Sequence, residues 1–420
     1  MAVRLLPKQE TRVRSSYLAQ SGDGGQARLR RGFDSHYPLV MYIMRYIRSI
    51  KNLKEKTCLL RLDLNVQDDE LKNSIRLDRA VESIQFLLKK GCRVLLVSYR
   101  GRPDVKRIGH DKKYRLKYSL KPVVREIERR MDERIAFVDY APPSSWGKHL
   151  NGAKTRIVAL ENTRFYKEEN QNSPVFAKKI AQLGDIYVND AFAMSHRDQA
   201  SLCAITKFLP SYAGIALEKE IAFLDRVAKK QEKPFGLILG GAKVSDKLGV
   251  LERFYNKTQW VLVGGGVANT FFVAQGFPVG SSLYEKGMLN VARIWAQKEK
   301  IHLPIDLAVF GGAILDIGPK TVSFYQEYIR RAKVIIWSGP VGNIEKKSYR
   351  RGTEGIIRAL LASRASCVVG GGETTSAFMT YLRAHKKKLP ARIFLSSGGG
   401  AMLAYLAKEK LPAFEALKQR

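Results

Sequence analysis

Six apolar runs in the second half of the chain end in glycine-containing turns. They are FGLILGG, WVLVGGG, LAVFGG, VIIWSGP, CVVGGG and IFLSSGGG, spread between Phe235 and Gly400. Apolar runs of this length without alternation are typical of strands that are covered on both faces, as in parallel sheets. Such sheets bind ligands beyond the carboxyl ends of their strands, where glycine lets backbone amides approach a phosphate. The pattern therefore predicts one phosphate-rich ligand, a nucleotide.

Apolar runs in the first half end in charged and amide side chains instead of glycines. The runs are CLLRLDLN, RVLLVSYRGRP, RIVALENTRF and IYVNDAFAMSHR. The polar side chains at their ends are Arg61, Asp63, Asn65, Arg102, Arg164, His196 and Arg197. A guanidinium group offers a rigid fork of donors that matches carboxylate or phosphate oxygens. We therefore expect this half to bind a small, multiply charged anion.

Helical periodicity separates these runs. Apolar residues recur at helical spacing in four intervening stretches, residues 77–90, 121–131, 174–183 and 352–363. Strands that alternate with helices predict βαβ crossovers and parallel sheets. A chain of 420 residues is long enough for two α/β domains with separate cores, and the change of motif near residue 220 predicts where they divide.

The composition is strongly basic. The chain has 73 Lys and Arg against 39 Asp and Glu, a net charge of +34. Because the excess is spread along the chain, we expect a basic surface that attracts anionic substrates, and no specific nucleic-acid binding. The four cysteines lack metal-site or disulfide spacing, and no apolar stretch is long enough for a bilayer. These features predict a cytoplasmic protein in a reducing compartment, without a membrane partner.

Residues 1–43 do not share the pattern of the rest of the chain. They are rich in Arg, Gly, Ser and Gln and have little apolar periodicity, so we leave them out of the predicted fold. A transit peptide is one interpretation, although Glu10, Asp23 and Asp34 count against it. We favour the alternative, an over-extended reading frame whose natural start is Met41 or Met44.

Two glycine-rich segments carry candidate nucleotide ligands. Lys243 and Lys247 in GGAKVSDK are four residues apart at the start of a predicted helix, which would direct both ammonium groups to the same phosphates. Because this is not a Walker sequence, a glycine turn followed by exposed lysines is the alternative. In GGGETTS the glycines predict a phosphate nest, and Glu373 is placed to hold Mg²⁺. The segment SSGGGAM either binds an anion or forms only a tight turn.

Two charged positions in the first half need partners or ligands. Arg61 lies within CLLRLDLN, where a central strand would not leave it unpaired, and Asp63 is its expected partner. A lone histidine such as His196 is more often structural than catalytic. With Asn189 and Asp190 closing the same strand, we favour a ligand-facing role.

Eleven segments in register resemble the phosphoglycerate kinase family, from about Met44 to the C-terminus. They are LRLDLN, SYRGRP, SLKP, LENTRFYKEE, YVNDAF, GGAKVSDK, GGG, LDIGPKT, WSGPVG, GGGETT and SGGGA. The resemblance implies two Rossmann-like domains with parallel sheets, joined by a hinge helix around residues 214–227. It also implies reversible phosphoryl transfer between ATP and the carboxylate of 3-phosphoglycerate, giving ADP and 1,3-bisphosphoglycerate, in glycolysis and gluconeogenesis.

The resemblance also implies the domain limits and the oligomeric state. Residues 44–215 would form the phosphoglycerate domain and residues 216–400 the nucleotide domain. Residues 401–420 would pack back on the first domain. The family expectation is a monomer.

Functional residues follow from the motifs and the resemblance together. Arg76 and Lys243 would approach the transferring group. The 3-phosphoglycerate ligands would be Arg61, Asp63, Asn65, Arg76, Tyr99, Arg102, Arg164, His196 and Arg197. The ligands of MgATP or MgADP would be Gly241, Lys243, Lys247, Gly265, Ser338, Glu345, Gly370, Gly371, Gly372, Glu373, Thr374 and Thr375, with Glu373 on the metal. Ser397, Gly398, Gly399 and Gly400 would form a loop that faces the anion in the transition state.

Three positions depart from the family's pattern. Tyr99 stands where a substrate-binding His is usual, Ser338 where an Asn is usual, and Glu373 where an Asp is usual. A phenol donates one hydrogen bond but carries no positive charge, and Glu373 is one methylene longer than Asp. We therefore predict an active kinase with a changed substrate or metal optimum. The alternatives are a catalytically weakened relative that serves as an interaction protein, and a basic nucleic-acid-binding module on an old enzyme scaffold.

Overall fold

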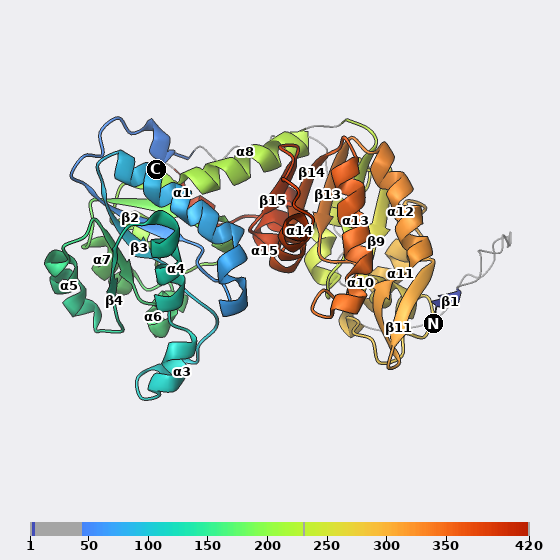
Figure 1. Ribbon diagram of the computed structural model, residues 1–420, viewed down its shortest axis with the longest axis horizontal. Coiled ribbons are helices and arrows are strands. Elements are labelled where there is room, and N and C mark those ends of the chain that lie inside the picture. Colours follow the sequence, from blue (N-terminus) through green and yellow to red (C-terminus); the bar gives the residue numbers. More distant parts are fainter. Residues whose placement is uncertain (1, 5–43, 230–231, 419–420) are drawn as a thin grey trace, which may run out of the picture.

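The computed structural model describes residues 2–4, 44–229 and 232–418, which form two α/β halves side by side (Figure 1). Each half contains a six-stranded sheet in which every strand pair is parallel. The predicted α/β class with two parallel sheets is confirmed. Within the described ranges, no helix has both the length and the apolar character that crossing a membrane requires.

The first sheet has the strand order β4-β5-β3-β2-β6-β7. Its strands are β2 (Thr57–Leu62), β3 (Arg93–Val97), β4 (Ile135–Val138), β5 (Ile157–Leu160), β6 (Ile186–Asp190) and β7 (Ser211–Ala213). The helices of this half are α1 (Ile75–Lys89), α2 (Val105–Ile108), α3 (Lys112–Lys117), α4 (Lys121–Met131), α5 (Trp146–Gly152), α6 (Lys167–Asn170) and α7 (Pro174–Ala181). Leu59 and Leu60 point to opposite faces of β2 and are both fully buried, as expected for a sheet covered on both sides.

The second sheet has the strand order β10-β9-β8-β13-β14-β15. Its strands are β8 (Phe235–Leu239), β9 (Trp260–Val263), β10 (Ile301–His302), β13 (Val334–Ser338), β14 (Ser366–Gly370) and β15 (Ile393–Ser396). The helices are α9 (Leu248–Phe254), α10 (Gly265–Ala274), α11 (Leu289–Ala296), α12 (Pro319–Arg331), α13 (Arg351–Ala362), α14 (Gly372–Ala384) and α15 (Gly399–Ala407). Five of the six glycine-ended runs supply strands of this sheet.

The helices follow from local sequence signals. In α1, Leu77, Ala80, Ile84 and Leu87 recur at helical spacing and are all buried, so one stripe of the helix packs on the sheet. The start of α7 has Pro at its first position, and the preceding Ser173 hydroxyl accepts a hydrogen bond from the helix. The four predicted helical stretches correspond to α1, α4, α7 and α13.

The sixth glycine-ended run, LAVFGG, lies outside the parallel sheet. It forms β11 (Asp306–Phe310), which pairs antiparallel with β12 (Ala313–Ile317) and with β1 (Ala2–Arg4). Gly311 and Gly312 have φ values of 58° and 75° and connect β11 to β12. The prediction that this run ends above the nucleotide is therefore wrong, because its glycines make a hairpin turn. Of residues 1–43, only β1 is described, and the rest of that prediction lies outside the described residues.

Helix α8 (Ile215–Lys229) leads from the first half to the second (Figure 1). The Asp190 carboxylate, at the end of β6, accepts hydrogen bonds from the Leu217 N–H at 2.7 Å and from the Ser83 hydroxyl. The C-terminal helix α16 (Pro412–Leu417) returns to the first half, where it packs beside β7. The C-terminal end therefore lies in the first half and β1 lies in the second.

Candidate active site

Three arginines, Arg61, Arg164 and Arg197, lie together at the carboxyl ends of the first sheet, and we call them the basic cluster. Burial, with the neighbouring charges of Arg197 and Arg61, lowers the pKa of Arg164 to about 10. Each of the three has a buried guanidinium nitrogen without a hydrogen-bond partner among the described residues: Nη2 of Arg61 and Nε of the other two. Buried donors without partners, in a cluster where positive charges outnumber negative ones, favour a bound anion.

Arg61 is the deepest member of the basic cluster, with 0% of its surface exposed. Its Nε donates to the Ser201 hydroxyl at 2.8 Å, and that hydroxyl donates to Glu169 at 2.6 Å. The expected partner, Asp63, pairs instead with Arg76, with 3.2 Å between Oδ2 and Nε. The predicted Arg61–Asp63 pair is wrong because β2 ends at Leu62, so the strand alternation that would bring the two side chains together stops before Asp63.

Tyr99 lies directly against the basic cluster. The Cζ atom of Arg164 is 3.7 Å from the centroid of its ring, and that of Arg61 is 5.4 Å away. The Tyr99 hydroxyl donates to the sulfur of Met194, and burial raises the pKa of Tyr99 to about 12. Tyr99 is therefore a neutral support beneath Arg164, with its hydroxyl already engaged.

Side chains of two strand-end loops bind the main chain of a third, at Gly101. The Asn65 side-chain oxygen accepts from the Gly101 N–H at 2.8 Å, and the Gly101 carbonyl accepts from Arg164 at 2.7 Å. Arg102 and His196 are exposed at the edge of this group. Asp190, in contrast, is buried and holds the start of α8.

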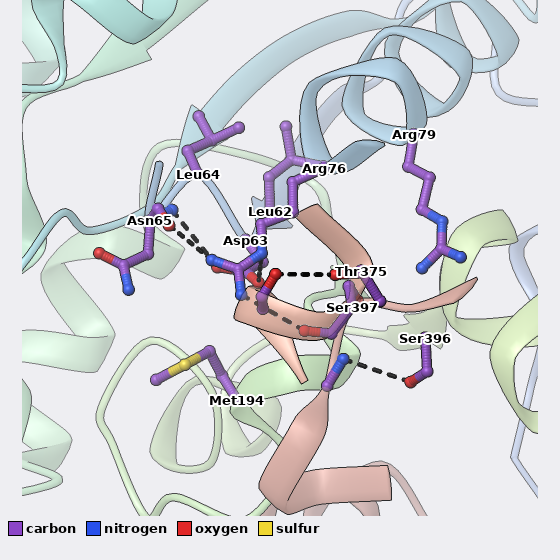
Figure 2. A network of polar contacts seen from close by, with 12 residues as sticks. Leu62, Asp63, Leu64, Asn65, Arg76, Arg79, Met194, Thr375, Ser396 and Ser397 are labelled. Atoms are coloured by element: carbon purple, nitrogen blue, oxygen red, sulfur yellow. Dashed lines mark hydrogen bonds and ion pairs between the residues drawn. The ribbon is translucent and has the colours of Figure 1, made fainter. Parts of the chain in front are cut away.

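Helix α1 places Arg76 between the two halves (Figure 2). Its Nε faces Asp63, whose charge raises the pKa of Arg76, and its Nη1 donates to the Asn65 carbonyl. Its Nη2 donates to the carbonyl of Ser397, in the second half, at 3.3 Å. A Cβ atom on Gly372 would lie 3.7 Å from the same Nη2. Arg76 therefore touches both halves at once.

A cavity of about 330 Å³ opens at the carboxyl ends of the second sheet. Gly241 and Gly265, both with positive φ, line it together with Glu373 from the start of α14. The neighbouring strand ends approach so closely that a Cβ atom on Gly339 would lie 2.2 Å from the Gly240 carbonyl oxygen. Only glycine permits this contact, so the strand ends can present backbone amides to a ligand.

Lys243 and Lys247 do not share a helical face. The 3₁₀ turn η7 (Ser245–Lys247) follows Lys243, and α9 begins only at Leu248. Lys243 is exposed, whereas Lys247 donates to the Ser338 hydroxyl at 3.1 Å and burial lowers the pKa of its ammonium group. The prediction of one shared face is wrong because the glycine-rich turn continues past Lys243.

The remaining predicted nucleotide residues, in residues 370–375 and at Glu345, do not line the cavity, apart from Glu373. Gly370 ends β14, and Gly371, with a φ of 104°, leads into α14 at Gly372. Thr375 donates to the Gly371 carbonyl at 3.0 Å, and the Thr374 hydroxyl is buried without a partner among the described residues. Glu345 is exposed in the loop after β13.

The segment Ser397–Gly400, which we call the serine–glycine loop, meets both halves. A Cβ atom on Gly399 would lie 2.9 Å from the Cα of Gly371, and one on Gly398 would lie 2.7 Å from the Phe192 ring. The loop then opens α15 at Gly399. It therefore lies where the second half adjoins the first half.

The donor set beside the cavity fits a magnesium ion that is held mainly by phosphate and water. Glu373 is an exposed carboxylate on the cavity wall, and no cluster of three or more His, Cys, Asp or Glu is found over the described ranges. Magnesium keeps several waters and needs few protein carboxylates when phosphates are present. One glutamate at this position is sufficient for such an ion.

Three further residues belong to the site and were missed from the sequence. Asn269 of α10 and Asp316 of β12 line the cavity of the second half, and Glu220 of α8 accepts hydrogen bonds from Ser397. Asn269 interrupts the apolar helix sequence GGVANTFFVA, which was a usable signal. Asp316 lies in the segment LDIGPKT, but nothing in the sequence around it indicated that its side chain would line a cavity. Glu220 has no sequence signal, because its partners are distant along the chain.

One half presents arginines for a small anion, and the other presents a glycine-lined cavity. This combination is typical of a kinase that binds a nucleotide. The sequence model of the family described as phosphoglycerate kinase matches residues 47–409. The phosphoglycerate kinase of Rubrobacter xylanophilus is 38% identical over 89% of this chain and 98% of its own length. That of Desulforudis audaxviator is 38% identical over 87% of this chain and 97% of its own length.

Solved structures agree with the sequence comparisons. Phosphoglycerate kinase from Coxiella burnetii has a TM-score of 0.70 and 32% identity, and covers 90% of this chain and 99% of its own. The enzyme from Pyrococcus horikoshii OT3 has a TM-score of 0.77 and 28% identity, and covers 89% of this chain and 98% of its own. The chain belongs to the phosphoglycerate kinase family. It is a transferase of glycolysis that binds ATP and has phosphoglycerate kinase activity, as the resemblance predicted.

Proposed function

We propose that the basic cluster and the loops around it bind 3-phosphoglycerate. Arg164 and Arg197 offer unpaired buried donors, and Asn65, Arg102 and His196 lie around them. Tyr99 supports Arg164 through its ring, and Arg61 adds charge from below. The arrangement suits a ligand with a phosphate and a carboxylate, because guanidinium groups pair with both.

The nucleotide occupies the glycine-lined cavity of the second half in this proposal. Gly241 and Gly265 approach the phosphates or the base, and Asn269 and Asp316 supply polar atoms on the wall. Glu373 is the carboxylate that would hold the magnesium ion of MgATP or MgADP. The ion would neutralise phosphate charge during transfer. Lys247 donates to Ser338, which pairs with Gly370 in the sheet, so both side chains would lie beside the nest formed by residues 370–372.

The reaction moves one phosphoryl group between the two ligands. A carboxylate oxygen of 3-phosphoglycerate forms a bond to the γ-phosphorus of ATP while the bond from that phosphorus to the ADP oxygen breaks. No proton moves and no enzyme intermediate is needed. Protein groups contribute alignment and positive charge, which a loose phosphoryl transition state requires above all. Arg76 and Lys243 would supply that charge.

One observation carries the proposal: Arg76 belongs to the first half and donates to Ser397 of the second. The same guanidinium pairs with Asp63 and lies beside Gly372. A cation at this junction can contact a group that passes from one ligand to the other. Neither half alone offers such a position among the described residues.

Separate binding measurements test the residue assignments. Titration calorimetry with 3-phosphoglycerate alone and with MgADP alone gives the affinity of each half. Arg164→Met should weaken 3-phosphoglycerate binding by about tenfold or more, because a charge-assisted contact is lost, and leave MgADP binding unchanged. Gly241→Val should weaken MgADP binding and leave 3-phosphoglycerate binding unchanged. Loss of both affinities in either variant, with unchanged thermal stability, would contradict the division between the halves.

The domain limits at residues 44, 216 and 401, the monomeric state and the cytoplasmic location stay predictions. The domain limits are supported by the position of α8 between the sheets and by the return of α16 to the first half. The four cysteines are buried and free, which suits a reducing compartment.

A further inference from the structure

Arg79 is a charged residue of α1 that lies outside the two ligand sites. It follows Arg76 by three positions and therefore lies on the same side of the helix. Its Nη1 pairs with the Glu220 carboxylate of α8, and its Nη2 donates to the Leu395 carbonyl of β15 at 2.6 Å. Figure 2 shows Arg79 on the same helix as Arg76, near Ser396 and Ser397. One side chain thus joins the first half, the connecting helix and the second half.

Two aromatic rings strengthen this junction. The guanidinium of Arg79 lies 5.0 Å from the centroid of the Phe394 ring in β15. Phe394 in turn stacks on Phe223 of α8, with 4.7 Å between centroids and 19° between planes. Cation–π contact and ring stacking both fix the relative position of the groups involved. The three elements therefore meet through charge, hydrogen bonding and packing at one point.

Glu220 connects this junction to the serine–glycine loop. Its Oε1 accepts from the Ser397 N–H at 2.9 Å and from the Ser397 hydroxyl at 3.0 Å, and its side chain is only 1% exposed. The Ser397 carbonyl accepts from Arg76. The loop is thus held twice by α1: directly by Arg76, and through Glu220 by Arg79. The side chains of all four residues border one cavity of about 20 Å³.

Removing one partner of a buried ion pair leaves the other charge without its partner and is costly. Arg79 is the only cation that forms an ion pair with Glu220 among the described residues. Without Arg79, Glu220 would lose its ion pair, and the carboxylate that accepts from Ser397 would be free to shift. The position of the loop relative to Arg76 therefore depends on Arg79.

We propose that Arg79 is a positioning residue for phosphoryl transfer, which acts by holding the Glu220 carboxylate in place and thereby keeping the serine–glycine loop aligned with Arg76. The proposal rests on the proposed function of Arg76 and of that loop. Arg79 does not line the nucleotide cavity and is not part of the basic cluster. Its loss should therefore reduce the rate of transfer and leave the binding of each separate ligand intact.

The test compares Arg79→Met, Arg79→Lys and the control Arg93→Met. Methionine keeps an unbranched apolar side chain without the charge, and lysine keeps a charge for Glu220 but cannot also reach Leu395 with a fork. Arg93 is a half-buried arginine that donates to the Leu150 and Ala153 carbonyls, within the first half alone. The measurements are kcat, KM, the separate affinities for 3-phosphoglycerate and MgADP, and hydrogen exchange of the Ser396–Gly400 amides.

Arg79→Met should lower kcat by about ten- to a hundredfold, the cost of misplacing reacting groups by about 1 Å. Both separate affinities should stay within about twofold, and exchange at residues 396–400 should become faster. Arg79→Lys should recover part of kcat, and Arg93→Met should change neither kcat nor that exchange. Unchanged kcat in Arg79→Met, or equal losses of kcat and of both affinities, would overturn the proposal.

Hydrogen exchange separates this proposal from the proposed function. It reports the hold of Arg79 on the loop whether or not the wild-type protein transfers phosphate. Absence of wild-type turnover, with faster loop exchange in Arg79→Met, would contradict the proposed function and keep the structural link. Normal wild-type turnover with unchanged loop exchange in Arg79→Met would contradict the link alone.

Discussion

Tyr99 lies with its ring against Arg164 and its hydroxyl on the Met194 sulfur. A tyrosine in this state can hold an arginine in place but has no free hydrogen atom to offer a substrate. The departure from the family's histidine is therefore a change in the support of Arg164, and the exposed His196 and Arg102 remain near the same rim.

Two substitutions of Tyr99 distinguish the contribution of its ring to substrate binding from that of its hydroxyl. Tyr99→Phe keeps the ring and should leave the KM for 3-phosphoglycerate within about twofold. Tyr99→Ala removes the cation–π support of Arg164 and should raise that KM by about three- to tenfold. Steady-state kinetics at saturating MgATP provide the comparison. An equally large effect of Tyr99→Phe would mean that the hydroxyl, and not the ring, serves the substrate.

Asp316 makes folding depend on pH. Burial raises its pKa to about 7, although the Gly352 and Ile317 N–H groups donate to the carboxylate. The ordinary value is 3.8, so between these pH values the folded protein keeps a proton that the unfolded chain has released. Asp316 therefore favours folding at acidic pH, and that contribution is lost as the pH rises through 7.

Asp316→Asn removes this titration. The free energy of unfolding of the wild type, relative to that of Asp316→Asn, should fall by about 1–2 kcal/mol between pH 5 and pH 7. Urea unfolding at several pH values measures the difference. Identical pH profiles for the two proteins would show that Asp316 does not hold a proton in the folded state.

Among the elements, α8 shows most clearly how distant residues determine the active-site geometry. Asp190 from β6 accepts from the N–H of Leu217 at its start, and Glu220 on its second turn holds Ser397. Burial raises the pKa of Asp190 to about 6, so the carboxylate is charged at neutral pH and binds its donors strongly. The helix is thereby fixed to both halves.

Removal of the Asp190 carboxylate should loosen this attachment. Asp190→Ala leaves the Ser83 hydroxyl and the Leu217 N–H buried without an acceptor, which should lower the free energy of unfolding by about 2 kcal/mol. Asp139→Ala is the control, because Asp139 is exposed and its ion pair with Lys121, at 3.7 Å, is weak in solvent. This substitution should change the free energy of unfolding by less than about 0.5 kcal/mol. Equal effects of the two substitutions in chemical denaturation would contradict the role of Asp190.

Element type was predictable from the sequence, whereas pairing between distant segments was not. Apolar runs such as VIIWSGP and IFLSSGGG predicted both the strand and the glycine turn at its carboxyl end, because periodicity and glycine are local signals. LAVFGG has the same local signal, yet β11 joins an antiparallel sheet with β12. The partners of Arg61, Asp63 and Glu220 come from segments far apart in the chain, so no spacing rule could identify them.

For the molecule as a whole, the net charge of +34 acts on the approach of its anionic ligands. Raising the ionic strength from about 20 mM to about 200 mM shortens the Debye length severalfold and should lower kcat/KM more than kcat. Kinetics with 3-phosphoglycerate over a series of potassium chloride concentrations check this. A kcat/KM that does not change with salt would mean that the charge does not assist substrate capture.

The central claim is that a ligand on each half meets its partner between Arg76 and Lys243. The most direct test is turnover of purified protein with MgATP and 3-phosphoglycerate, coupled to reduction of the acyl phosphate. The Lys243→Ala variant is compared with Lys298→Ala, which removes an exposed lysine elsewhere in the second half. Lys243→Ala should lose about a hundredfold or more in kcat while it still binds MgADP, and Lys298→Ala should match the wild type. Full turnover in Lys243→Ala would contradict the account.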